Sequence, residues 1–80
     1  MIFINKERRA ALRKAKQVFE QGQEMLADVI DKEDEAFADL PENLQESYNG
    51  IRMQDAISYM DDAERKIRSA MDDLDMILES

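Results

Sequence analysis

The length, composition and charge of this chain exclude most catalytic and metal-binding classes of protein. Its 80 residues include no cysteine, no histidine, two glycines and one proline, and its formal net charge at pH 7 is −8. Disulfides, zinc sites, thiol nucleophiles and imidazole bases are therefore excluded. A residue set rich in Ala, Leu, Met, Glu and Lys favours an all-α fold over a sheet.

A first long helix is predicted over about residues 6–38. Asn5 is a good N-cap, because its side-chain oxygen can accept a hydrogen bond from the first helical turn. Apolar residues then recur along one helical stripe, and Gly22 is the only helix breaker before Pro41. The proline ring disfavours helical geometry at Leu40, so the first helix should end there after roughly 50 Å.

Two breaks separate this helix from a second one. The segment at residues 39–42 has the form of a capping box and predicts a short helical turn over residues 41–46. A Ser-Tyr-Asn-Gly break at residues 47–50 follows, with two N-cap candidates. The second long helix is expected over about residues 49–78. Residues 1–80 should therefore form one domain, an antiparallel helical hairpin.

The second helix carries the clearest pattern, a heptad seam of large apolar residues interrupted once by Glu64. Beside this seam, small residues recur every seven positions, as at Ala56 and Ala63, and the first helix has a matching small row that includes Ala15 and Gly22. Small residues allow two backbones to approach closely. We therefore expect the two helices to meet on their small rows and to leave the large rows free.

Two helices bury only part of their apolar surface, and this chain has no disulfide to compensate. We predict that it self-associates as a homodimer or higher homo-oligomer, most simply as a four-helix bundle with coiled-coil packing. The large apolar residues are the predicted contacts between copies. They are Phe19, Leu26, Ile30, Phe37, Met53, Ile57, Met60, Ile67, Met71, Leu74 and Leu78.

Positive charge is concentrated at the start of the chain. Residues 1–16 carry six basic and one acidic side chain, a net charge of +5, whereas residues 17–80 carry a net charge of −13. In a hairpin the basic segment lies beside the acidic residues at positions 72–79, so we favour internal pairing over nucleic-acid binding, which is the alternative. Contacts with a partner are predicted at exposed aromatic and arginine side chains. They are Tyr48, Tyr59, Arg8, Arg9 and Arg13.

No pattern in the sequence predicts catalysis, and we expect neither an enzyme nor a cofactor- or metal-binding protein. Di-metal sites in helical bundles combine Glu with His, which this chain lacks. Glu33 and Glu64 interrupt apolar stripes, and we interpret them as members of register-setting ion pairs with Lys or Arg of the neighbouring helix. The apolar run at residues 1–4 is too short for a signal peptide or a membrane span, which predicts a cytoplasmic protein without a membrane partner.

The turn between the helices resembles a known group of proteins. The stretch LPENLQES at residues 40–47 follows an acidic helix that ends in Ala36-Phe37, and it precedes Gly50 and a second acidic helix. Over about residues 30–78 this arrangement resembles small proteins of unknown function encoded by phages and prophages of Gram-positive bacteria. The resemblance implies an origin in a mobile element and a bacterial host cell. It carries no assigned activity, and it does not extend to the basic first helix.

Three functions are compatible with these features. The leading hypothesis is a small oligomeric helical protein that presents an interaction surface to another macromolecule of the host or phage. The competing hypothesis is an acidic inhibitor that imitates nucleic acid and occupies the basic groove of a host nuclease, defence protein or DNA-binding protein. The third is an oligomeric trap for an anionic small ligand held by Arg8, Arg9 or Arg13.

Overall fold

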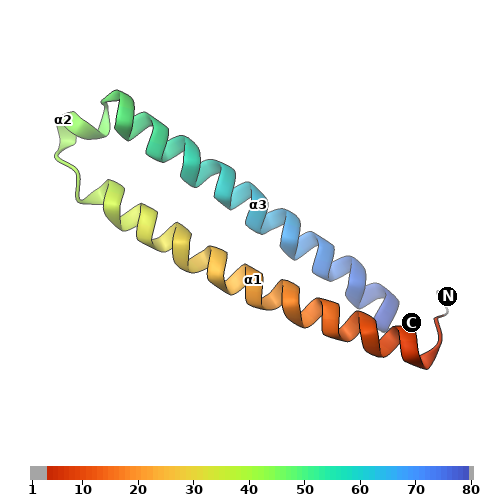
Figure 1. Ribbon diagram of the computed structural model, residues 1–80. Helices are drawn as coiled ribbons and strands as arrows, with labels where there is room; N and C mark the ends of the chain where they lie inside the picture. The colour runs from red at the N-terminus through yellow and green to blue at the C-terminus, as the bar shows by residue number, and fades with distance from the viewer. Residues whose placement is uncertain (1–3, 80) are drawn as a thin grey trace.

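The computed structural model describes residues 4–79, which form three helices, α1 (Lys6–Ala38), α2 (Glu42–Gln45) and α3 (Tyr48–Leu78). Figure 1 shows α1 and α3 running antiparallel beside each other, with α2 at one end and the start of α1 close to the end of α3 at the other. The molecule measures 58 × 18 × 14 Å. The predicted helical hairpin of a long helix, a short turn helix and a second long helix is confirmed.

Local hydrogen bonds determine where the long helices begin. Asn5 caps α1 as predicted, because its side-chain oxygen accepts a hydrogen bond from the backbone N–H of Arg8 at 2.9 Å. Ser47 caps α3 in the same way and accepts from the backbone N–H of Gly50 at 3.3 Å. Because Ser47 takes the cap, α3 includes Tyr48 and begins one residue before the expected position.

The turn differs from the sequence prediction in its capping. Asp39 does not open a capping box, because it ends α1 in helical geometry and its backbone N–H donates to the carbonyls of Glu35 and Phe37. Pro41 takes the N-cap position of α2 and makes no side-chain cap hydrogen bond. The Gln45 side chain instead donates to the Phe37 carbonyl at 3.2 Å and to the Leu40 carbonyl at 3.1 Å. The short helix α2 thus adds a hydrogen bond to a carbonyl in the last turn of α1 and one to a carbonyl of the segment that follows it.

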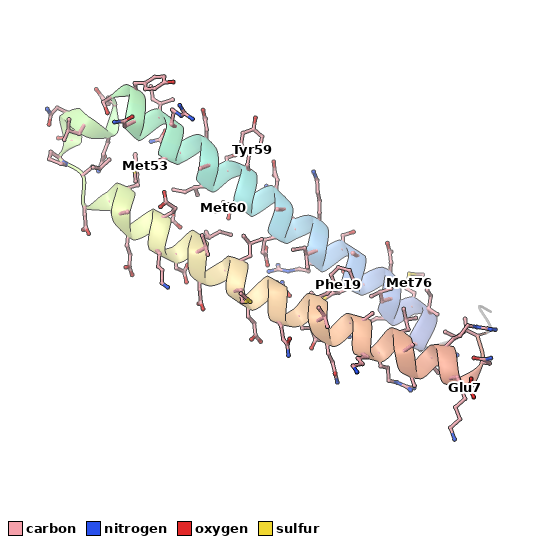
Figure 2. All side chains as sticks on the ribbon, viewed as in Figure 1. Glu7, Phe19, Met53, Tyr59, Met60 and Met76 are labelled. Carbon is pink, nitrogen blue, oxygen red and sulfur yellow. The ribbon has the colours of Figure 1, made fainter. Side chains whose placement is uncertain are left out.

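The seam between α1 and α3 follows a heptad pattern in both helices, with buried and half-buried side chains at alternating steps of three and four residues. Figure 2 shows Met53 and Met60 on the face of α3 that is turned toward α1. In α1 the seam residues are Arg9, Leu12, Lys16, Gln23, Leu26, Ile30, Glu33 and Phe37. In α3 they are Gly50, Met53, Ile57, Met60, Glu64, Ile67, Met71, Leu74 and Leu78.

This seam shows that the prediction that the two helices meet on their small rows is wrong. The helices meet on their large rows, whereas Ala15, Gly22, Ala56 and Ala63 of the small rows are exposed. A Cβ added at Gly22 would meet no other atom within 4 Å, so no backbone approaches it. The physical reason is that burying Leu, Ile, Met and Phe removes far more apolar area from water than burying alanine.

The core that results is thin. Ile30 and Met71 are its most buried hydrophobic residues, and none of the described side chains is fully buried. The accessible surface of the chain is 6306 Å², whereas a compact monomer of 9.3 kDa is expected to expose about 5,000 Å². The extended hairpin therefore leaves about 1,300 Å² more surface in water than a globular chain of its mass.

Candidate interaction surface

One long side of the hairpin is centred on the two small rows, and we call it the small-residue side. Each small row follows a seam row by three residues, so it lies on the flank of its helix. Antiparallel helices are related by a two-fold axis perpendicular to their common plane, and this places the two small rows on the same side of the hairpin. The rows comprise Ala15, Gly22, Val29 and Ala36 of α1 and Ala56, Ala63, Ala70 and Ile77 of α3.

Large apolar side chains border these rows. Val18 and Met25 each lie three residues after a member of the α1 row, and they are 63% and 69% exposed. Tyr59 has the same relation to Ala56 in α3 and is 76% exposed; Figure 2 shows its ring pointing away from α1. Together with Val29 of the α1 row they make four of the nine large hydrophobic residues exposed in the described chain. The small-residue side is therefore the main exposed apolar surface.

A shallow apolar hollow lies at one end of this side. Its lining comes from the beginning of α1 and from the residue before the N-cap, and it comprises Ile4, Arg8, Ala11, Leu12 and Ala15. Arg8 is the only charged residue of that lining. The hollow therefore extends the apolar surface and is not a site built for an anion.

The opposite side of the hairpin, which we call the acidic side, carries more charged residues than the small-residue side. Its rows include four basic residues, Lys6, Arg13, Arg65 and Arg68. Its carboxylates are Glu20, Glu24, Asp31, Asp34, Asp61, Asp72 and Asp75. The helical charges on the small-residue side are mainly basic, namely Arg8, Lys32, Arg52 and Lys66 with Asp73. The two long sides therefore differ in both polarity and sign of charge.

The basic segment does contact the end of α3, through two side chains. Lys16 forms an ion pair with Asp75 across the helices and a second one with Glu20 of its own helix at 3.7 Å. The hydrogen bond to Asp75 raises the pKa of Lys16 above its ordinary value. Arg9 donates to the Leu78 carbonyl at 2.7 Å and to the Ile77 carbonyl at 3.3 Å. A cation at these carbonyls also suits the negative end of the α3 dipole.

The remaining charges of this end are not brought together. Asp72, Asp73 and Glu79 make no ion pair with the residues that the structure describes. Arg8 lies on the small-residue side and Arg13 on the acidic side, while Arg9 turns toward α3. The three arginines predicted to hold an anionic ligand therefore point in three directions.

Glu64 occupies its predicted place in the seam, but its partners differ from the prediction. Its Oε1 atom accepts from the Gln23 side chain of α1 at 2.7 Å and from Arg68 of α3 at 2.6 Å. The bond across the helices therefore comes from a neutral amide, and the ion pair stays within α3. The hydrogen bond from Gln23 is the main reason why the pKa of Glu64 lies below its ordinary value. Glu33 is half-buried and has no hydrogen bond or ion pair with the described residues.

Ten of the eleven residues predicted to join copies lie in the seam, where the other helix of the same chain covers them in part. Phe19 is the exception and is 43% exposed. Tyr48, predicted as a contact residue, is 72% exposed at the tip of the hairpin, where Arg52 lies over its ring at 5.5 Å and donates to its hydroxyl at 3.1 Å. Val18 and Met25 were not predicted. The signal that could have identified them is their spacing of three residues from Ala15 and Gly22.

No group of three or more acidic side chains in residues 4–79 is arranged to hold a metal ion. Buried polar side-chain atoms without a hydrogen bond are likewise absent from this part of the chain. None of its helices is long and apolar enough to cross a membrane.

Comparisons with models of protein families, with curated proteins and with solved structures found no match to this chain.

Proposed function

We propose that this protein is a small helical interaction protein that works as an oligomer and presents a rigid surface to another macromolecule. The observation that carries the proposal is the surplus of accessible surface on an extended hairpin with a thin core. The accessible surface exceeds that of a compact chain of equal mass by about 1,300 Å². A standard protein–protein interface covers about 800 Å² on each partner, so the surplus is large enough for one.

The thin core supports the same proposal. Long helices gain most of their stability from burying an apolar face against a neighbour. In the described chain the only neighbour of α1 is α3 with the short α2, and just two hydrophobic residues are buried. A phage or prophage origin fits a small accessory protein of this kind, and we retain it as part of the proposal. The partner macromolecule is then a host or phage protein.

Light scattering and thermal melting test the oligomer. At micromolar concentration we expect a mass of at least twice 9.3 kDa and a melting temperature that rises with protein concentration, because binding stabilises the folded state by mass action. A 9.3 kDa monomer with full helicity and a melting temperature independent of concentration would contradict the proposal.

The acidic side supports a second candidate function, an inhibitor that imitates nucleic acid. It carries seven carboxylates and four basic residues along the length of the hairpin, and such a field steers association with basic partners. Binding of the protein to a basic DNA-binding protein or nuclease should then weaken steeply with salt. It should also weaken when Glu24 and Asp31 are changed to Gln and Asn, whereas Met25→Ala leaves it unchanged. If the Met25 variant is the weaker binder, the acidic side is not the contact.

A further inference from the structure

We propose that the small-residue side binds an acidic amphipathic helix of another protein, which lies lengthwise along the strip between α1 and α3. This inference rests on the proposed function and adds the chemistry of the partner and the face that holds it. The partner helix would place a stripe of small and apolar side chains on the two small rows, with carboxylates on both flanks of that stripe.

The charge of the small-residue side is opposite in sign to that of the chain. The whole chain has 11 basic and 19 acidic side chains. Among the helical residues this side carries only one of the acidic ones, Asp73, but four of the basic ones, Arg8, Lys32, Arg52 and Lys66. A partner that carries carboxylates is therefore attracted to this side, whereas a second copy would bring the same cations of both chains together.

The cations of this side are not neutralised within the hairpin. The ion pairs between described residues all involve basic residues of the seam or of the acidic side. Arg8, Lys32 and Lys66 are exposed, and their side chains make no ion pair with residues 4–79. Arg52 donates to the hydroxyl group of Tyr48, which is neutral. Carboxylates of another molecule can therefore pair with these side chains without breaking an existing ion pair.

The middle of the side suits the apolar stripe of a helix. From Ala15 to Ala36 the small row of α1 extends for about 30 Å, which is the length of a helix of about 20 residues. A Cβ added at Gly22 would have no neighbour within 4 Å, so the backbone of a third helix can approach closely here. Met25 of α1 and Tyr59 of α3 are 69% and 76% exposed at the borders of the strip and would pack against the flanks of that helix.

The apolar hollow at the open end of the hairpin adds a place for an anchoring side chain. Besides Arg8, its lining residues are Ile4, Ala11, Leu12 and Ala15. Helices bound in grooves are commonly anchored by a large apolar side chain that enters such a hollow. Arg8 is then placed to pair with a carboxylate of the partner next to that anchor.

The spacing of the cations favours a helix over nucleic acid or a membrane. Arg8 lies at the open end of the hairpin, Lys32 and Arg52 lie near the tip, and Lys66 lies between them, with apolar side chains separating these positions. Nucleic acid offers a continuous row of phosphates and no apolar stripe to cover the strip. An anionic membrane surface would repel a chain with a net charge of −8.

Binding of two designed peptides to the full chain tests the chemistry of the partner. Both peptides have about 20 residues with alanine and leucine on one helical face. One carries glutamate on both flanks of that face, and the other carries glutamine at the same positions. Fluorescence anisotropy should show that the glutamate peptide binds at least about fivefold more tightly, by a margin that shrinks as salt is added. Equal affinities, or no binding of the glutamate peptide, would overturn the inference.

A matched pair of double variants tests the place of the contact. Lys32→Gln with Lys66→Gln removes two cations from the small-residue side, and Lys6→Gln with Lys14→Gln removes two exposed cations from elsewhere on α1. The first pair should weaken binding of the glutamate peptide about fivefold. The second pair makes the same change in net charge and should leave the affinity unchanged. Equal affinities of the two double variants would place the peptide elsewhere and overturn the inference.

Met25→Glu and Ala27→Glu separate the partner helix from other occupants, because these exposed positions lie on opposite sides of α1. Met25→Glu should weaken binding of the glutamate peptide at least about tenfold, since a charge would enter the apolar contact. Ala27→Glu should leave this binding unchanged. A second copy or a membrane is the occupant if the wild type binds no peptide and Met25→Glu weakens either self-association or binding to phosphatidylserine vesicles. Either result would overturn the inference.

Light scattering on the same samples distinguishes this inference from the proposed function. If the protein is oligomeric and does not bind the glutamate peptide, the inference is overturned and the proposed function stands. If the protein is monomeric at every concentration and binds the glutamate peptide through the small-residue side, the oligomer of the proposed function is contradicted and the inference stands.

Discussion

Glu64 shows how a single seam residue can define the alignment of two helices. Burial alone would raise the pKa of its carboxyl group, but the hydrogen bond from Gln23 and the bonds from Arg68 outweigh that effect. From Gln23 and Glu64 one heptad step in each helix leads to Ile30 and Ile57, so the polar contact also places these apolar residues opposite each other. An amide donor achieves this without the desolvation of a second charge.

The lowered pKa of Glu64 predicts a specific dependence of stability on pH. A carboxyl group with a pKa lower in the folded than in the unfolded state stabilises the fold above its unfolded value of 4.5, and the gain is lost as the pH falls through the folded value. Glu64→Gln should therefore lower the melting temperature at pH 7, and the difference from wild type should shrink below pH 4.5.

Thermal melts of wild type and Glu64→Gln at several pH values check this prediction. Glu24→Gln is the control, because Glu24 is exposed on the same hairpin and makes no side-chain hydrogen bond or ion pair with the described residues. Glu24→Gln should change the melting temperature only slightly, and this change should not vary over the same pH range. If Glu64→Gln changed the melting temperature equally at pH 7 and pH 3, the charged Glu64 carboxylate would not be the source of the stabilisation.

At the scale of elements, the short helix α2 closes the tip of the hairpin by lying against the start of α3. The contact is close because Gly50 has no side chain, and a Cβ there would overlap the carbonyl oxygens of Leu44 and Gln45. The Gln45 amide then donates to the carbonyl of Phe37 in α1 and to that of Leu40 in the connecting segment. The glycine therefore serves close packing, since its backbone is helical.

This contact predicts an effect of Gly50→Ala opposite to the usual one. Glycine to alanine in a helix is ordinarily stabilising by about 1 kcal/mol. Here we expect a loss of about 1–3 kcal/mol in the free energy of unfolding, because the backbone of α2 must move away. Urea denaturation measures the change, with Asn49→Ala in the same helical turn as a control that should stay within about 0.5 kcal/mol of wild type. An increase in stability for Gly50→Ala would show that α2 does not lie against α3.

At the scale of the whole molecule, basic and acidic side chains are distributed unevenly over the two ends and the two long sides. The basic start of α1 meets the end of α3, where Arg9 and Lys16 are engaged with backbone carbonyls and with Asp75. Two carboxylates of the acidic side, Asp72 and Asp75, lie at this end. Duplex DNA approaching it would meet a mixed surface, because charges within about 8 Å of each other act together at physiological salt.

We therefore predict that the protein does not bind duplex DNA tightly. Electrophoretic mobility shifts at about 0.15 M salt should show little or no complex at micromolar protein. Arg9→Ala should lower the melting temperature, because it removes donors from the end of α3, with no change in DNA binding. Tight binding that falls steeply with salt and is lost in Arg9→Ala, with an unchanged melting temperature, would make the basic segment a nucleic-acid arm instead.

The sequence alone was sufficient for the elements of this fold. The helix formers, the cap at Asn5 and the break at Pro41 act over a few residues, so they can be read locally. The heptad spacing of the large residues in the second helix also identified a seam, because a period of 3.5 residues always places such residues on one stripe.

Only the tertiary structure decided which row of each helix packs against the other helix and which row stays outside. Each helix has a large row and a small row side by side, and periodicity describes both equally well. Packing within the chain favours the large rows because they bury more apolar area per residue, and the hydrogen bond between Gln23 and Glu64 and the ion pair of Lys16 with Asp75 align them. The small rows are thereby left outside, which is why the candidate surface lies where Val18 and Met25 are exposed and not on the seam.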